Sequence, residues 1–75
     1  MTELSKQEKL VLIDEHIKNV ETNIFNLNLL VIQESALDPI NQEQISALEA
    51  RLQNAFLKKD ALIAEKEKVN SESAE

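Results

Sequence analysis

Residues 10–31 read LVLIDEHIKNVETNIFNLNLLV, and this stretch decides the fold. Its apolar residues recur at alternating intervals of three and four, at Leu10, Ile13, Ile17, Val20, Ile24, Leu27 and Val31. An α-helix brings such positions onto one stripe, because it completes a turn about every 3.6 residues. The pattern predicts a long helix whose heptad seam packs against another helix. The alternative, an ordinary core-facing stripe, requires the same long helix.

Local signals for the start and end of helices divide the chain in two. Ser5 with Glu8 three residues later forms a capping box, and Pro39 disfavours helical geometry at the residue before it. Asn41 can cap a second helix, although Asp38 with Pro39 is an alternative start. We expect a short N-terminal arm (1–4), a helical hairpin (5–69) and a disordered polar tail (70–75). The hairpin divides into a helix at 5–36, a turn at 37–41 and a helix at 41–69.

The second predicted helix carries a seam of its own, at Ile45, Leu48, Leu52, Ala55, Leu62 and Val69. Lys59 and Lys66 fill the remaining seam positions, where their stems can pack while their ammonium groups reach water. A short connection forces the second helix back along the first. We therefore expect a core in which Ile17, Val20, Ile24 and Leu27 are buried against Leu48, Leu52, Ala55 and Phe56.

The composition supports an all-α class and argues against chemistry. Among 75 residues there is no Cys, no Gly and one His, so disulfides, thiolate metal sites and Gly-rich phosphate loops are excluded. His16 follows Asp14 and Glu15, but three consecutive residues point in different directions around a helix. We therefore expect no catalytic, cofactor or metal site and no small-molecule substrate, and we do not expect an enzyme.

The chain is acidic, with 14 acidic and 8 basic residues and a formal net charge of −6. This charge disfavours contact with nucleic acid and with anionic membranes, so we expect neither as a partner. The longest uncharged stretch, residues 22–33, is too short and too polar to span a bilayer. The polar N-terminus lacks the features of a signal peptide, and we expect a cytoplasmic protein of the producing or infected cell.

Apolar residues outside the seams predict self-association. One stripe lies on the first helix and another on the second, and their members are Phe25, Leu29, Ile32, Ala36, Ala47, Ala50 and Leu57. Leaving so many apolar side chains in water would be a large loss for a small domain. We expect them to join two hairpins into a homodimeric four-helix bundle. The alternative is that exposed apolar residues are simply common on protein surfaces.

The chain resembles two groups of small proteins. Its expected architecture resembles plasmid-encoded helical hairpins that dimerise into four-helix bundles and bind RNA loop pairs. Because this acidic chain lacks their basic and aromatic RNA-binding face, the resemblance implies shape and no RNA-binding residues. In brevity and in its bias toward Ile, Asn, Glu and Lys it is similar to orphan accessory proteins of tailed phages, which implies a viral origin.

Two functions follow from these observations. The first is a non-catalytic interaction or assembly module that associates with itself. The alternative is a small, phage-encoded inhibitor or regulator that binds a host or cellular protein through a helix face.

Overall fold

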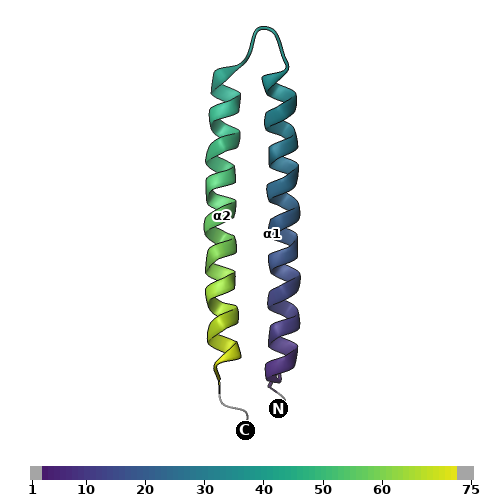
Figure 1. Ribbon diagram of the computed structural model, residues 1–75, viewed down its shortest axis with the longest axis vertical. Helices are drawn as coiled ribbons and strands as arrows, with labels where there is room; N and C mark the ends of the chain where they lie inside the picture. Colours follow the sequence, from purple (N-terminus) through teal and green to yellow (C-terminus); the bar gives the residue numbers. More distant parts are fainter. Residues whose placement is uncertain (1–2, 73–75) are drawn as a thin grey trace.

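The computed structural model describes residues 3–72 and consists of two long helices joined by a turn (Figure 1). Helix α1 spans Lys6–Ser35 and helix α2 spans Gln42–Asn70. They run antiparallel, so that the start of α1 and the end of α2 lie at the end opposite the turn. The Cα positions extend over 60 × 18 × 14 Å. Residues 3–72 contain no strand, and the predicted all-α helical hairpin is confirmed.

Side-chain caps begin both helices. The Glu8 amide donates to Ser5 Oγ over 3.1 Å, and the Ser5 amide donates to Glu8 Oε1 over 2.8 Å, which completes the predicted capping box. The Gln44 amide donates to Asn41 Oδ1 over 3.1 Å, so Asn41 rather than Asp38 caps α2. Three helix boundaries lie one residue inside the predicted ones, at Lys6, Ser35 and Gln42, because cap residues flank the helix without belonging to it. Helix α2 ends one residue later than predicted, at Asn70.

We expect Asn41→Ala to lower the free energy of unfolding by about 1 kcal/mol, because the Gln44 amide would lose its side-chain acceptor. Urea unfolding followed by circular dichroism measures the change. Asn26→Ala is the matched control, since Asn26 is exposed inside α1 and Ala is the better helix former there. Equal losses in the two variants would show that the cap contributes nothing.

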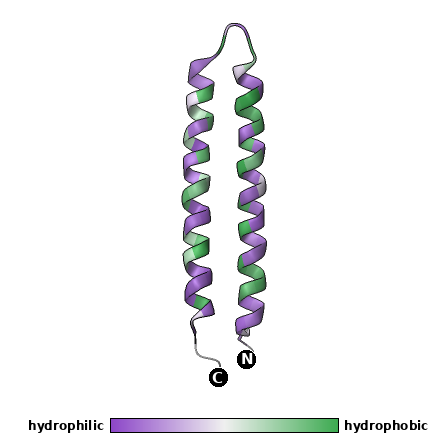
Figure 2. Cartoon of the chain, viewed as in Figure 1, coloured by the Kyte–Doolittle hydropathy of each residue, from purple (hydrophilic) through white to green (hydrophobic). Residues whose placement is uncertain are grey.

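The core lies in the seam between the helices and is best closed in the half nearest the turn. The buried residues are Ile24 and Leu27 of α1 with Ile45, Leu48, Ala55 and Val69 of α2. Val20, Val31 and Leu52 pack against the cluster that Ile24, Leu27, Leu48 and Ala55 form. Figure 2 shows hydrophobic and hydrophilic residues alternating along both helices, as a heptad seam requires.

Phe56 is not part of this core, and its predicted burial is wrong. Its side chain is 46% exposed. Phe56 follows the seam residue Ala55 by one position, which turns it about 100° away from the seam. It therefore flanks the contact between the helices and faces solvent along one side of the hairpin.

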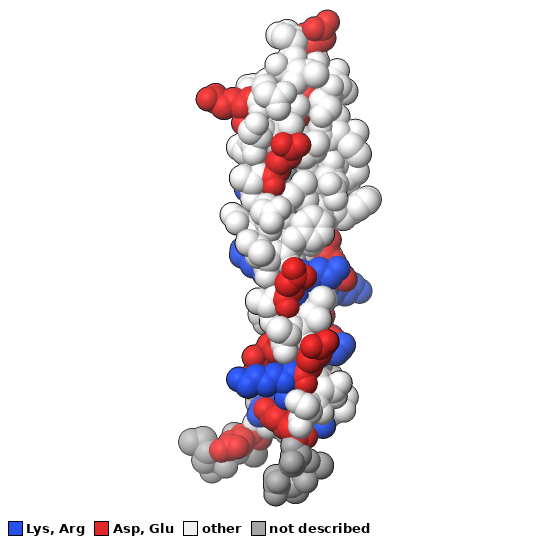
Figure 3. Space-filling view, turned by 60° about the vertical axis from the view of Figure 1, so that its left-hand side comes forward, with Lys and Arg blue, Asp and Glu red and all other residues white. Residues whose placement is uncertain are grey.

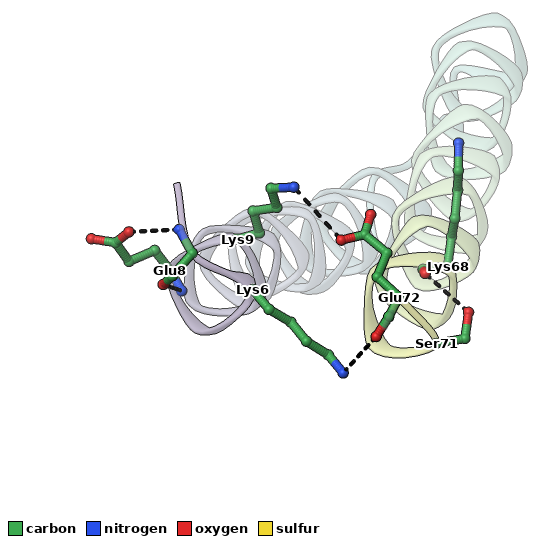
Figure 4. Close-up of polar contacts among 7 residues, drawn as sticks. Lys6, Glu8, Lys9, Lys68, Ser71 and Glu72 are labelled. Atoms are coloured by element: carbon green, nitrogen blue, oxygen red, sulfur yellow. Dashed lines mark hydrogen bonds and ion pairs between the residues drawn. The ribbon is translucent and has the colours of Figure 1, made fainter. Parts of the chain in front are cut away.

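The predicted disordered tail begins too early. Asn70 is the last residue of α2. The Ser71 amide donates to the Glu67 carbonyl over 3.0 Å, and the Glu72 amide donates to the Val69 carbonyl over 3.1 Å. Figure 4 shows Glu72 held from α1: Lys6 Nζ donates to its backbone carbonyl over 3.2 Å, and Lys9 Nζ lies 3.6 Å from its carboxylate. Residues 73–75 of the predicted tail and residues 1–2 of the predicted arm lie outside the described residues.

Candidate interaction surface

Two ion pairs join the helices in the half nearest the termini. Lys59 Nζ lies 3.1 Å from Glu21 Oε2, and Lys66 Nζ lies 2.8 Å from Asp14 Oδ1. Both lysines occupy seam positions and are partly buried, as predicted. The two pairs are seven residues apart on each helix, so they repeat the heptad. Because the four side chains keep between 30% and 55% of their surface in contact with water, the pairs contribute little to stability, but they define the register of the two helices.

The hairpin has two broad sides, and the seam determines which residues lie on each. Both helices are right-handed, and they run in opposite directions with their seams facing each other. Consequently a residue one position after a seam residue points to the same side of the hairpin in α1 and in α2. The ion pairs agree: Glu21 follows the seam residue Val20 and Asp14 follows Ile13, and both reach seam lysines from that one side.

Five large apolar side chains lie on this same side: Val11 lies near the start of α1, and the other four lie in the middle of the hairpin. Phe25 and Ile32 of α1 and Phe56 and Ile63 of α2 each follow a seam residue by one position. Their side chains are 63%, 64%, 46% and 38% exposed, respectively. We call these four residues the phenylalanine face. It is formed by both helices and lies across the middle of the hairpin.

The seven residues predicted for self-association are all exposed, but helix geometry does not bring them together. Phe25 and Ile32 belong to the phenylalanine face, whereas Ala47 precedes the seam residue Leu48 and so points to the opposite broad side. Three others lie two positions from a seam residue and point outward, away from the partner helix: Leu29 on α1, and Ala50 and Leu57 on α2. Ala36 is the C-cap that follows α1. The predicted surface did not include Phe56, which was expected in the core, or Ile63. Phe56 and Ile63 could have been found from the sequence, because each follows a seam residue by one position and so lies on the same side as Phe25 and Ile32.

Apolar residues are also exposed at both ends of the hairpin. A shallow hollow of about 320 Å³ at the start of α1 is lined by Leu4, Gln7, Glu8, Val11 and Leu12. At the other end, the turn exposes Leu37 and Ile40, at 51% and 52%. Neither region brings polar groups together around a cavity.

Charge is distributed unevenly along the hairpin. Residues 19–57 contain five acidic side chains and one basic side chain, a net charge of −4 out of −6 for the whole chain. The basic residues otherwise lie toward the termini. Figure 3, which brings α2 forward, shows few charged side chains in the half nearest the turn and interspersed positive and negative ones in the other half.

The described residues offer little for chemistry. His16 is exposed on α1, and residues 3–72 contain no group of three or more His, Cys, Asp or Glu side chains that could hold a metal ion. Neither α1 nor α2 combines the length and the hydropathy that crossing a membrane requires. The phenylalanine face is the candidate functional surface, because both helices contribute large, exposed apolar side chains to it.

Comparison of the chain with protein-family models, with curated proteins and with solved structures found no match.

Proposed function

We propose that this protein is a non-catalytic helical assembly module that associates with itself through the phenylalanine face. The observation that supports the proposal is the presence of four large, exposed apolar side chains on one side of a two-helix hairpin. Two hairpins packed through this side would form a homodimeric four-helix bundle. The same patch would then be buried from both partners, as in other two-fold dimers.

The energetics of a small chain support a second copy as the partner. Burying an apolar side chain such as Phe or Ile contributes roughly 1.5–3 kcal/mol, and each of the four is between 38% and 64% exposed in the single hairpin. A two-helix hairpin buries a single seam, and a chain of this length builds only a marginal core by itself. Association would extend the core across the phenylalanine face without any additional partner.

The size of the broad side also suits a dimer. Helices of 30 and 29 residues are each about 45 Å long at 1.5 Å per residue, and the hairpin is 18 Å wide between Cα positions. The footprint of the whole side is therefore about 800 Å², which is similar to the area that a typical specific protein–protein interface buries on each partner.

Sedimentation of the purified chain across a range of concentrations tests this proposal. We expect a reversible monomer–dimer equilibrium, with helicity and unfolding temperature that rise with protein concentration. A fully helical, monodisperse monomer at high micromolar concentration would contradict self-association. The phenylalanine face would then be available to a different protein, as expected of an inhibitor or regulator.

A further inference from the structure

We infer that the two hairpins of the dimer pack antiparallel, with the turn of each beside the termini of the other. In this arrangement a two-fold axis crosses the phenylalanine face at the height of Phe25 and Phe56. The inference rests on the proposed self-association and adds the orientation of the second copy. It follows from the positions of the two phenylalanines, from the charge distribution and from the exposed ends of the hairpin.

Phe25 and Phe56 lie at nearly the same height on the hairpin. The Glu21–Lys59 ion pair marks a common level on the two helices. Phe25 lies four residues from Glu21 toward the turn, and Phe56 lies three residues from Lys59 in the same direction. At 1.5 Å per residue these steps are about 6 and 4.5 Å. A single axis across the face can therefore pass close to both phenylalanines, and each would meet its own copy.

The same axis relates positions at equal distances above and below it. On α1, Ile32 lies seven residues from Phe25 toward the turn and Lys18 lies seven residues toward the start of the helix. Both follow a seam residue by one position, so both are on the phenylalanine face. The antiparallel dimer places Ile32 over Lys18 of the second copy, where the aliphatic stem of the lysine can cover it. On α2, Glu49 and Ile63 are related to Phe56 in the same way.

Electrostatic repulsion between the two copies is weaker in the antiparallel arrangement than in the parallel one. A parallel dimer would place the two turn halves, with a net charge of −4 each, side by side. The antiparallel dimer moves them to opposite ends and sets each beside the other half, which contains seven of the eight basic residues and has a net charge of only −2. The antiparallel arrangement therefore lowers the repulsion between the two acidic chains.

The exposed apolar residues at the two ends of the hairpin also favour the antiparallel orientation. Val11, 46% exposed at the start of α1, lies fourteen residues from Phe25, and the turn lies the same distance beyond it. The antiparallel dimer brings the turn, with exposed Leu37 and Ile40, to the height of Val11 on the second copy. In a parallel dimer the two turns would lie together and Val11 would lie beside the end of α2 of the second copy.

Disulfide trapping between two single-cysteine chains tests the orientation. The chain has no Cys of its own, and Ile32, Lys18 and Ser46 are all exposed, so substitution should leave the hairpin folded. Ile32→Cys is refolded together with Lys18→Cys in one sample and with Ser46→Cys in another. Both samples are equilibrated in a glutathione redox buffer, and intact-mass spectrometry identifies the products.

We expect the Ile32→Cys chain to form a mixed disulfide with the Lys18→Cys chain at least tenfold more than with itself or with the Ser46→Cys chain. A dominant mixed disulfide with the Ser46→Cys chain would overturn the inference, because a parallel dimer places α1 over α2 of the second copy. Statistical cross-linking among all chains would overturn it too. Both of these results leave the proposed self-association intact if sedimentation shows a dimer, whereas a monomer in sedimentation contradicts the proposed function itself.

Discussion

Leu48→Ala is expected to lower the free energy of unfolding by about 2–5 kcal/mol, the range for removing a Leu side chain from a core. Leu48 is 2% exposed and packs in the cluster with Ile24, Leu27 and Ala55. The hairpin has only two elements, so the surroundings can collapse only by moving one whole helix toward the other. The free-energy cost of a residual cavity would therefore be a large fraction of the total free energy of unfolding.

Leu57→Ala is the matched control, because it makes the same chemical change on the same helix. Leu57 is 56% exposed and points away from α1, and its truncation should change the free energy of unfolding by less than about 0.5 kcal/mol. Urea unfolding at one fixed protein concentration measures both variants, since dimerisation makes stability concentration-dependent. Equal losses for the two substitutions would place the core on the wrong face of α2.

The hairpin could be predicted from the sequence because its determinants are local. The three- and four-residue spacing of the apolar residues predicts the seam. Ser5, Glu8 and Asn41 predict where the helices start. Each of these signals acts within one or two turns of a helix. The placement of Lys59 and Lys66 was predictable for the same reason, since a seam position and a long amphipathic side chain suffice to specify it.

The surface was harder to predict because it depends on both helices at once. A heptad pattern gives the direction of a side chain around its own helix. Whether Phe56 is buried depends on how far α1 reaches around α2, and two helices touch along a narrower stripe than the apolar residues occupy. The predicted set contained Ala47, Ala50 and Leu57 together with Phe25 and Ile32. These side chains lie in the same part of the hairpin but point to different sides of it. The contacts of Glu72 with Lys6 and Lys9 likewise join residues from opposite ends of the chain.

Phe25→Glu is expected to weaken self-association by about 100-fold or more. Phe25 is 63% exposed in the single hairpin, so the substitution should leave the seam undisturbed and the helicity unchanged. In the proposed dimer the change removes one buried aromatic side chain from each partner, at roughly 1.5–3 kcal/mol apiece. A total of about 3 kcal/mol or more corresponds to a factor of at least about 100 in the dissociation constant. Near a two-fold axis the two new carboxylates would also face each other.

Leu29→Glu and Leu57→Glu distinguish the phenylalanine face from the outward-facing apolar residues of α1 and α2. Both introduce the same charge at exposed positions, 38% for Leu29 and 56% for Leu57. Neither side chain lies on the phenylalanine face, so we expect each change to alter the dissociation constant less than tenfold. Sedimentation of the wild type and the three variants over the same concentration range gives the comparison, with circular dichroism to verify that each variant is folded.

The variant that dissociates the dimer shows which surface forms the contact between the two hairpins. If Leu29→Glu or Leu57→Glu dissociates the dimer while Phe25→Glu does not, the contact lies on the back of one helix, and two hairpins joined in that way could add further copies without closing. If Phe25→Glu alone dissociates it, the contact includes the broad side that both helices form. That side is shared symmetrically by two copies, and association through it stops at a dimer because each hairpin has a single phenylalanine face.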